Sequence, residues 1–149
     1  MVETTFFTQN SVLNAAFIAW FLAQFIKVML SFKGGKIDFS RITGAGGMPS
    51  SHSSTVLALT TAVCMACGYQ SPEFAISLVL SGIVMYDATG VRRAAGEQAK
   101  IINYMMSHWN KTTPQTFSKE LKELLGHTPL EVVAGAILGI VVGLVVVRL

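Results

Sequence analysis

Two short stretches of the sequence carry side chains that could perform chemistry on a phosphate. In the first, a glycine-rich run leads through Pro49 to Ser50, Ser51 and His52, directly before a long apolar segment. A helix beginning near Pro49 presents free backbone N–H groups and the positive end of its dipole, an arrangement that binds oxyanions. The two serines can cap that helix or donate hydroxyl groups to a ligand. An ordinary loop with an N-cap also explains the proline and serines, but it leaves His52 without a role.

The second stretch lies directly before the last apolar segment and contains His127 and Glu131. Thr128 and Glu131, with Pro129 between them, fit a capping box, which gives the carboxylate a purely structural role. A carboxylate four residues after a histidine at a helix start can also bind one ring nitrogen. That contact fixes the tautomer and leaves the other nitrogen as a nucleophile or base. The capping box alone does not account for His127.

Charged residues near other segment ends could bind the same phosphate. Lys27 either snorkels to the membrane interface or turns inward to neutralise a bound anion. Arg41 has the planar fork for bidentate phosphate contact, although a solvated loop arginine has the same sequence signature. Asp87 with Arg92 and Arg93 closes the third apolar segment. One arginine can pair with Asp87 while the other binds ligand, or the cluster is a stop-transfer signal with a surface ion pair.

These residues must be positioned by membrane helices. The 149 residues are 52% hydrophobic and 13% charged, with a mean hydropathy of +0.55, whereas about 25% charged residues is usual in soluble domains. We predict an all-α integral membrane protein with one domain over residues 1–149, and a soluble helical bundle is the alternative. A membrane span needs about 20 helical residues, and about four segments approach that length: Ser11–Phe32, Ser53–Gly68, Pro72–Ala88 and Pro129–Val147.

Two further segments are predicted to form short interfacial helices. Residues 94–109 mix polar and apolar side chains in the manner of an amphipathic helix on the membrane surface. A second short helix is expected to open at Thr112 and to end at Gly126.

The basic residues predict the orientation in the membrane. They concentrate between the first and second spans and between the third and fourth, whereas only Arg148 lies on the other side. The positive-inside rule therefore places both basic loops, and the site, in the cytoplasm and both termini outside. The expected location is the plasma membrane of a bacterium or an organellar equivalent. The net charge of +3 reflects this topology, so no nucleic-acid partner is needed to explain it.

Two regular spacings in the helices receive structural interpretations. Cys64 and Cys67 form a C-x-x-C pair, but no second pair or nearby histidine completes a metal site, so both are predicted to be small core residues and no metal is expected. Gly135, Gly139 and Gly143 recur every four residues. Such a small-residue face allows a helix of this chain or of a second copy, as in a homo-oligomer, to approach closely.

Together these motifs resemble the type 2 phosphatidic-acid phosphatase superfamily, which includes the vanadium haloperoxidases, and especially its small divergent branch. The resemblance covers most of residues 20–143 and includes Pro-Ser-Ser-His, His-x-x-x-Glu and the phrase Met-Tyr-Asp-Ala-Thr-Gly-Val-Arg-Arg. It implies that His127 is the nucleophile that takes the phosphoryl group, that Glu131 orients it and that His52 is the general acid. It also implies that phosphate is held by Ser50, Ser51, the adjacent backbone and Lys27.

The sequence departs from the superfamily pattern at several positions. No Arg-Pro follows Lys27 at the expected spacing, Ser51 replaces a glycine and Glu131 replaces an aspartate. Leu121 stands where the superfamily has an arginine, and four spans replace the usual six. The missing cation must therefore come from elsewhere in the chain, and the candidates are Arg41, Arg92 and Arg93.

The sequence thus predicts a membrane phosphatase that acts through a phosphohistidine without metal or cofactor. The expected substrate is a phospholipid or polyprenyl phosphate or pyrophosphate, because the predicted site lies where a lipid head group would sit. The alternatives are a non-catalytic membrane protein that binds anions or lipid head groups, a small transporter with the same pocket, and a structural subunit built around the glycine face. For catalysis we expect His127 to face His52 across a pocket lined by Lys27 and an arginine.

Overall fold

The computed structural model describes residues 9–30, 47–108 and 126–148, apart from the side chain of Arg92. This part of the chain forms five helices and no strand: α1 Ser11–Leu30, α3 Ser51–Cys67, α4 Pro72–Thr89, α5 Val91–His108 and α6 Pro129–Arg148. Helices α1, α3, α4 and α6 coincide with the four predicted spans to within about two residues at each described end, and this confirms the all-α prediction.

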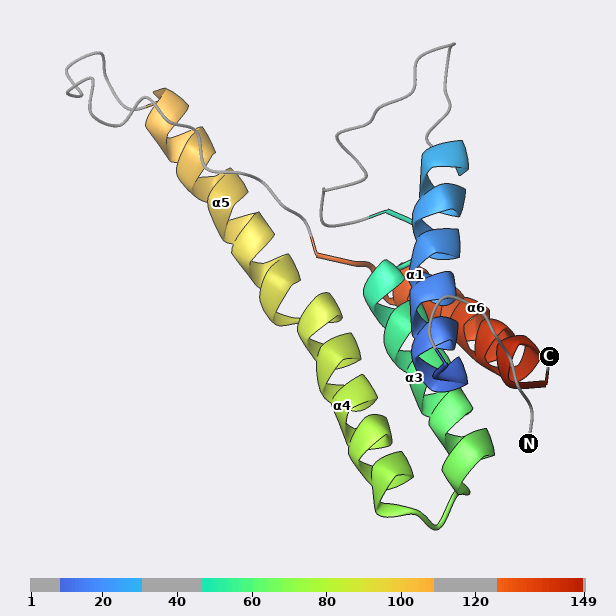
Figure 1. Cartoon of the computed structure of the whole chain (residues 1–149). Coiled ribbons are helices and arrows are strands. Elements are labelled where there is room, and N and C mark those ends of the chain that lie inside the picture. Colours follow the sequence, from blue (N-terminus) through green and yellow to red (C-terminus); the bar gives the residue numbers. More distant parts are fainter. Residues whose placement is uncertain (1–8, 31–46, 109–125, 149) are drawn as a thin grey trace.

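The helix ends follow the local sequence. Ser71 is the N-cap of α4: its hydroxyl accepts a hydrogen bond from the Phe74 amide at 3.1 Å, and Pro72 occupies the first helical position. Helix α3 ends before Gly68, which has a φ of +88°, a conformation that glycine adopts without steric cost. Because the turn between these helices is short, α3 and α4 run side by side in opposite directions (Figure 1).

Helix α3 is the centre of the bundle, since it packs against α1, α4 and α6. It is also the shortest of the four predicted spans. Three helical stretches are long and apolar enough to cross a membrane: Ser11–Leu30, Pro72–His108, which joins α4 and α5, and Pro129–Arg148. The described part of α3 is a shorter apolar helix of 17 residues. The shortest helix is therefore the one that its neighbours surround.

Helix α5 extends away from the bundle in roughly the direction of α4 (Figure 1). Among the described helices it packs only against α4. It begins three residues earlier than predicted and exposes several apolar side chains, including Ile101, Ile102 and Tyr104. The second predicted interfacial helix lies outside the described residues except for Gly126, which belongs to an irregular segment before α6.

The interior of the bundle is built from small side chains and the exterior from large ones. The buried apolar residues are mostly alanines, such as Ala19, Ala58 and Ala62, whereas Phe17, Phe21 and many other large apolar side chains are exposed. A soluble protein has the opposite distribution. Helices in a membrane associate through close packing of small residues while lipid covers the large ones. The described residues therefore have the packing expected of an integral membrane protein.

The three regularly spaced glycines of α6 face α3 of the same chain. A Cβ at Gly135 or Gly139 would overlap the carbonyl oxygen of Ser50 or Ser54, and one at Gly143 would lie 2.8 Å from the oxygen of Ala58. The glycine face is thus used for helix packing within the chain. A homo-oligomer remains a prediction, but it would need a different surface.

Hydroxyl groups connect α3 to its other neighbours. Thr60 lies 2.7 Å from the Ser81 hydroxyl of α4, and the Ser81 hydroxyl donates to the carbonyl of Val56 at 3.1 Å. On the other side Ser54 donates to the carbonyl of Ala19 in α1 at 3.1 Å. In the absence of water, such hydrogen bonds satisfy buried hydroxyls and fix neighbouring helices relative to each other.

A methyl group at Gly139 tests the close crossing of α3 and α6. We expect Gly139→Ala to destabilise the protein by about 1–3 kcal/mol because the helices must separate to accommodate it. Gly82→Ala is the matched control, since a Cβ at Gly82 meets no atom within 4 Å and alanine favours a helix over glycine by about 1 kcal/mol. The measurement is the thermal unfolding midpoint in detergent. Equal unfolding midpoints for the two variants would contradict the close packing of α6 on α3 at Gly139.

Candidate functional site

Four helix ends meet at one end of the bundle. The backbone amide of Ser50, at the start of α3, donates to the carbonyl of Glu131 in the first turn of α6 at 3.0 Å. The amide of His127, just before α6, donates to the carbonyl of Ala88 near the end of α4, also at 3.0 Å. The last turn of α1 brings Lys27 to the same place. The two chemical stretches lie far apart in the sequence, with α3, α4 and α5 between Ser50 and His127, and hydrogen bonds of their backbones hold them at the same end of the bundle.

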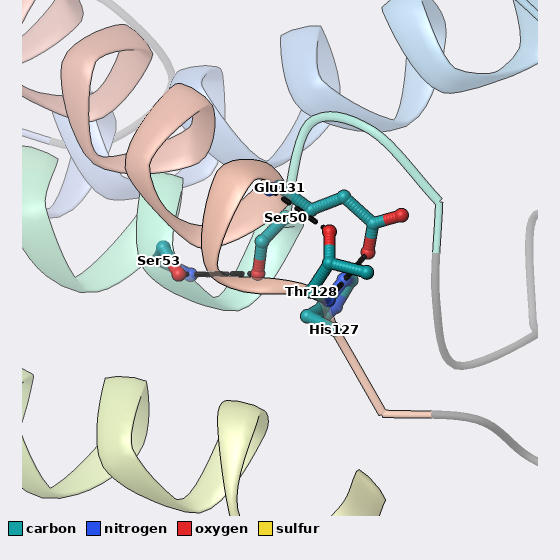
Figure 2. Close-up of polar contacts among 5 residues, drawn as sticks. All are labelled: Ser50, Ser53, His127, Thr128 and Glu131. Carbon is teal, nitrogen blue, oxygen red and sulfur yellow. Dashed lines mark hydrogen bonds and ion pairs between the residues drawn. The ribbon is translucent and has the colours of Figure 1, made fainter.

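Glu131 makes two of its predicted contacts with a single carboxylate oxygen. Its Oε2 lies 3.0 Å from Nδ1 of His127 and accepts a hydrogen bond from the amide of Thr128 at 3.1 Å (Figure 2). In return the Thr128 hydroxyl accepts the Glu131 amide at 3.4 Å. The capping box and the contact with the histidine are therefore present together. The structural and the chemical interpretation of this carboxylate do not exclude each other.

The contact with Glu131 indicates which nitrogen of a neutral His127 ring carries the proton. An ionised carboxylate can only accept a hydrogen bond, so the proton of a neutral His127 ring belongs on Nδ1. The lone pair is then on Nε2, the nitrogen that can act as a nucleophile or base. His127 is buried, with 2% of its surface exposed, so its ring is held in a defined orientation.

His52 brings the second imidazole to the site from the first turn of α3. The ring centroids of His52 and His127 lie 5.9 Å apart with an angle of 67° between the planes. This is an edge contact between rings. The two imidazoles are together, as expected, with the edge of one ring against the other. The expected pocket lined by Lys27 and an arginine stays a prediction.

The serines of the first stretch are packed into the helix start. Ser50 is fully buried and is the N-cap of α3: its hydroxyl oxygen accepts bonds from the amide of Ser53 at 3.4 Å and from the Ser53 hydroxyl at 3.1 Å (Figure 2). Ser51 is 5% exposed. The capping role of Ser50 is thus established by geometry, and its own hydroxyl proton is left to donate.

Lys27 turns into the bundle and does not snorkel, since it is only 4% exposed. Its aliphatic stem packs against Gly47, where a Cβ would lie 3.4 Å from both Cγ and Cδ of the lysine. Gly47 has a φ of +88°, and this conformation, not the contact with the lysine, favours glycine at this position. Burial removes the Lys27 amine from water, and Glu131 is near enough to interact with it electrostatically. A lysine is therefore buried near the carboxylate that binds His127.

The remaining candidates lie at the junction of α4 and α5 or beyond the described residues. Asp87 is half-buried in the last turn of α4, and the side chain of Arg93 is exposed. The backbone of Arg93 lies against Gly126, next to His127. The predicted pair of Asp87 with an arginine remains a prediction. Outside the described residues lie Arg41, Leu121 and the side chain of Arg92.

Three residues contribute to the site in roles that were not predicted: Gly47, which lies in the glycine-rich run, Ala88, and Gly126, which was expected only to end a short helix. Each acts through its backbone or through the absence of a side chain. A glycine directly before a candidate nucleophile was a usable signal for Gly126, whereas nothing in the sequence distinguishes the carbonyl of Ala88 from its neighbours. A signal for the inward Lys27 was present too, because it follows Ala19 and Ala23 at intervals of four on one helix face.

Metal binding has no geometric support in the part of the chain that the structure describes. No group of three or more His, Cys, Asp or Glu side chains there could hold a metal ion. Cys64 and Cys67 are both free, Cys64 partly buried and Cys67 exposed.

The tautomer of His127 is directly measurable. We expect the ¹⁵N spectrum of ring-labelled protein at neutral pH to show His127 protonated on Nδ1. Glu131→Ala removes the acceptor, so the ring should shift toward the Nε2-protonated form that free histidine prefers. The His127→Gln variant assigns the signal, because His108 also directs its Nδ1 at an acceptor, the carbonyl of Tyr104. An unchanged spectrum in Glu131→Ala would show that the carboxylate does not set the tautomer.

Comparison with known proteins identifies the family of the chain. The chain matches the Divergent PAP2 family over residues 8–142, where PAP2 is the type 2 phosphatidic-acid phosphatase. YuiD, an uncharacterized membrane protein of Bacillus subtilis (strain 168), is 46% identical in an alignment that covers 91% of this chain and 93% of that protein. No solved structure matches the chain. The matches confirm the resemblance to the divergent branch, and the chain belongs to the Divergent PAP2 family.

Proposed function

We propose that this membrane protein hydrolyses a lipid phosphate or pyrophosphate through a phosphohistidine at His127. The observation that carries the proposal is the arrangement of two imidazoles at two helix starts. His127 has its Nδ1 bound to Glu131, and the ring of His52 lies 5.9 Å away. A nucleophile, a group that orients it and a second acid or base within contact distance are the components that covalent phosphoryl transfer requires.

The charges around the site favour an anionic substrate. Helices α3 and α6 both begin here, so the positive ends of their dipoles lie at the same end of the bundle. Lys27 adds a buried positive charge. Stabilisation of the charge on the equatorial oxygens is the largest contribution a protein makes to phosphoryl transfer. The arrangement therefore suits the transition state of this reaction.

The proposed reaction has two steps. Nε2 of His127 attacks phosphorus, the bond to the leaving oxygen breaks, and His52 donates a proton to that oxygen. Glu131 stabilises the positive charge that develops on the His127 ring. Water then attacks the phosphohistidine, His52 takes a proton from it, and the phosphorus–nitrogen bond breaks to release phosphate. Because the two rings touch in the structure, a bound phosphoryl group would have to displace the ring of His52.

The cation that the superfamily supplies at the position of Leu121 must come from another residue. The α4–α5 junction is the best-supported source, because the backbone of Arg93 lies against Gly126 beside the proposed nucleophile. Arg92 and Arg93 are therefore proposed to bind phosphate, with Asp87 as a partner that orients one of them. Arg41 and the hydroxyls of Ser50 and Ser51 remain proposed phosphate ligands as well.

The substrate and the side of the membrane follow from the location of the site. The positive-inside rule puts this end of the bundle in the cytoplasm, at the level where a lipid head group meets its tail. A phospholipid phosphate or a polyprenyl pyrophosphate would present its phosphate there. No metal or cofactor takes part in the proposed steps.

A non-catalytic protein that binds anions or head groups is the main rival, and a small transporter is the other. The departures at position 121 and after Lys27 favour them, because the loss of a cation weakens catalysis more than binding. Neither rival needs the contact between His127 and Glu131. Measurement of phosphate release therefore distinguishes the phosphatase from the binding protein and the transporter.

The activity test uses purified protein in detergent with phosphatidate or a polyprenyl pyrophosphate and a metal chelator. We expect phosphate release that vanadate inhibits, that His127→Ala abolishes, and that His52→Ala lowers by about 10²–10⁴-fold through loss of the acid. His108→Ala is the control, because His108 lies on the exposed end of α5. Binding of these lipids without turnover by the unaltered protein would instead support the binding role.

The orientation can be tested with two single cysteines after Cys64 and Cys67 have been replaced by serine. Tyr69 lies in the turn between α3 and α4 and is 72% exposed, and Glu97 on α5 is exposed as well. We expect a membrane-impermeant maleimide to label Tyr69→Cys in intact cells and Glu97→Cys only after permeabilisation. The reverse pattern would place the site outside the cytoplasm.

A further inference from the structure

Gly126 lies directly before His127 and has no room for a side chain. A Cβ at this position would lie 2.5 Å from the amide nitrogen of Arg93, 2.8 Å from the carbonyl oxygen of Ala88 and 2.9 Å from Cα of Arg93. All three atoms belong to the backbone, so they cannot move aside as a flexible side chain could. Any residue other than glycine at position 126 must displace the segment that carries His127.

The same junction also binds His127 itself. The amide of His127 donates a hydrogen bond to the carbonyl of Ala88 at 3.0 Å. In an unbroken helix that carbonyl would accept the amide of residue 92, four positions later. Helix α4 instead ends at Thr89, with Gly90 as its C-cap, and α5 starts at Val91. Carbonyls in the last turn of a helix lack partners within it, so the break between α4 and α5 provides an acceptor for His127.

We propose that the α4–α5 junction, residues 88–93, positions the His127 ring, and that Gly126 is the positioning residue that allows the contact. Two contacts then determine the position of the ring: the backbone amide of His127 donates to the Ala88 carbonyl, and its Nδ1 binds Glu131. Ala88 belongs to α4 and Glu131 to α6. The ring therefore keeps its place beside His52 only while α4 and α6 keep theirs. The expected effect on kcat rests on the proposed phosphatase function. The expected effect on the position of the ring does not.

The test compares Gly126→Ala with Gly82→Ala, a glycine on α4 that has open space around its Cα. With a lipid phosphate as the probe, we expect Gly126→Ala to lower kcat by about 10²-fold, the effect of a small misplacement of a reacting group, and to leave KM unchanged. The ¹⁵N signal of His127 should lose its Nδ1-protonated signature as the ring leaves Glu131. Gly82→Ala should change neither quantity. A Gly126→Ala protein with unaltered kcat and an unaltered His127 signal would overturn the proposal.

Amide hydrogen exchange on the unaltered protein provides a second measurement that needs neither the variant to fold nor the enzyme to be active. The amide of His127 should exchange slowly, as the amide of Ser50 should, because each is bound to a carbonyl of another segment. Exchange of the His127 amide at the rate of an unprotected amide would overturn the proposal. A protein without phosphatase activity but with a protected His127 amide would refute the proposed function and leave the positioning role intact.

Discussion

The close crossing of α3 and α6 is the contact on which the site depends. Three glycines of α6 let it lie directly on the backbone of α3, and the first of them packs on Ser50, the N-cap of α3. The hydrogen bond from the Ser50 amide to the Glu131 carbonyl joins the helices at the same point. Bulkier side chains along this seam would move the two helix starts apart. His52 and His127 would then lose contact although both local motifs remained intact.

A single carboxylate links the fold of this site to its chemistry. Glu131 caps its own helix through Thr128, binds His127 and attracts the buried Lys27. A charge in a membrane is costly unless it has partners, and each of these groups is a partner for another. The same contacts therefore stabilise buried polar groups and orient the His127 ring. The capping box and the contact with His127 are both present, whereas the chemical role of that contact stays a prediction.

Much of the fold was predictable because membrane spans and helix caps have strong local signals. Hydropathy gave the four spans, and Ser71 with Pro72 marked the start of α4. The spacing of His127 and Glu131 predicted their contact, since residues four apart lie on one face of a helix start. The orientation of Lys27 was ambiguous, because a lysine at this depth in a membrane helix can either extend to the interface or turn into the bundle. Only the alanines one and two turns earlier indicate the inward face.

Other parts of the site could not be read from local patterns, because they arise where distant segments meet. The glycine face of α6 predicted a close helix partner but not its identity, and α3 of the same chain turned out to fill it. The acceptor for the His127 amide is a carbonyl, which every residue has. That the rings of His52 and His127 touch depends on the tilt of two helices, which hydropathy does not encode. Tertiary packing decided each of these points.

The inverted distribution of side-chain sizes has an evolutionary consequence. A large apolar residue that faces lipid can be exchanged for another of similar hydrophobicity, since acyl chains adapt to its shape. An alanine, serine or glycine inside the bundle has no such freedom, because a few added atoms would force two backbones apart. In relatives of this chain, substitutions should therefore accumulate mainly at the lipid-facing phenylalanines, leucines and isoleucines, while the small residues inside the bundle stay unchanged.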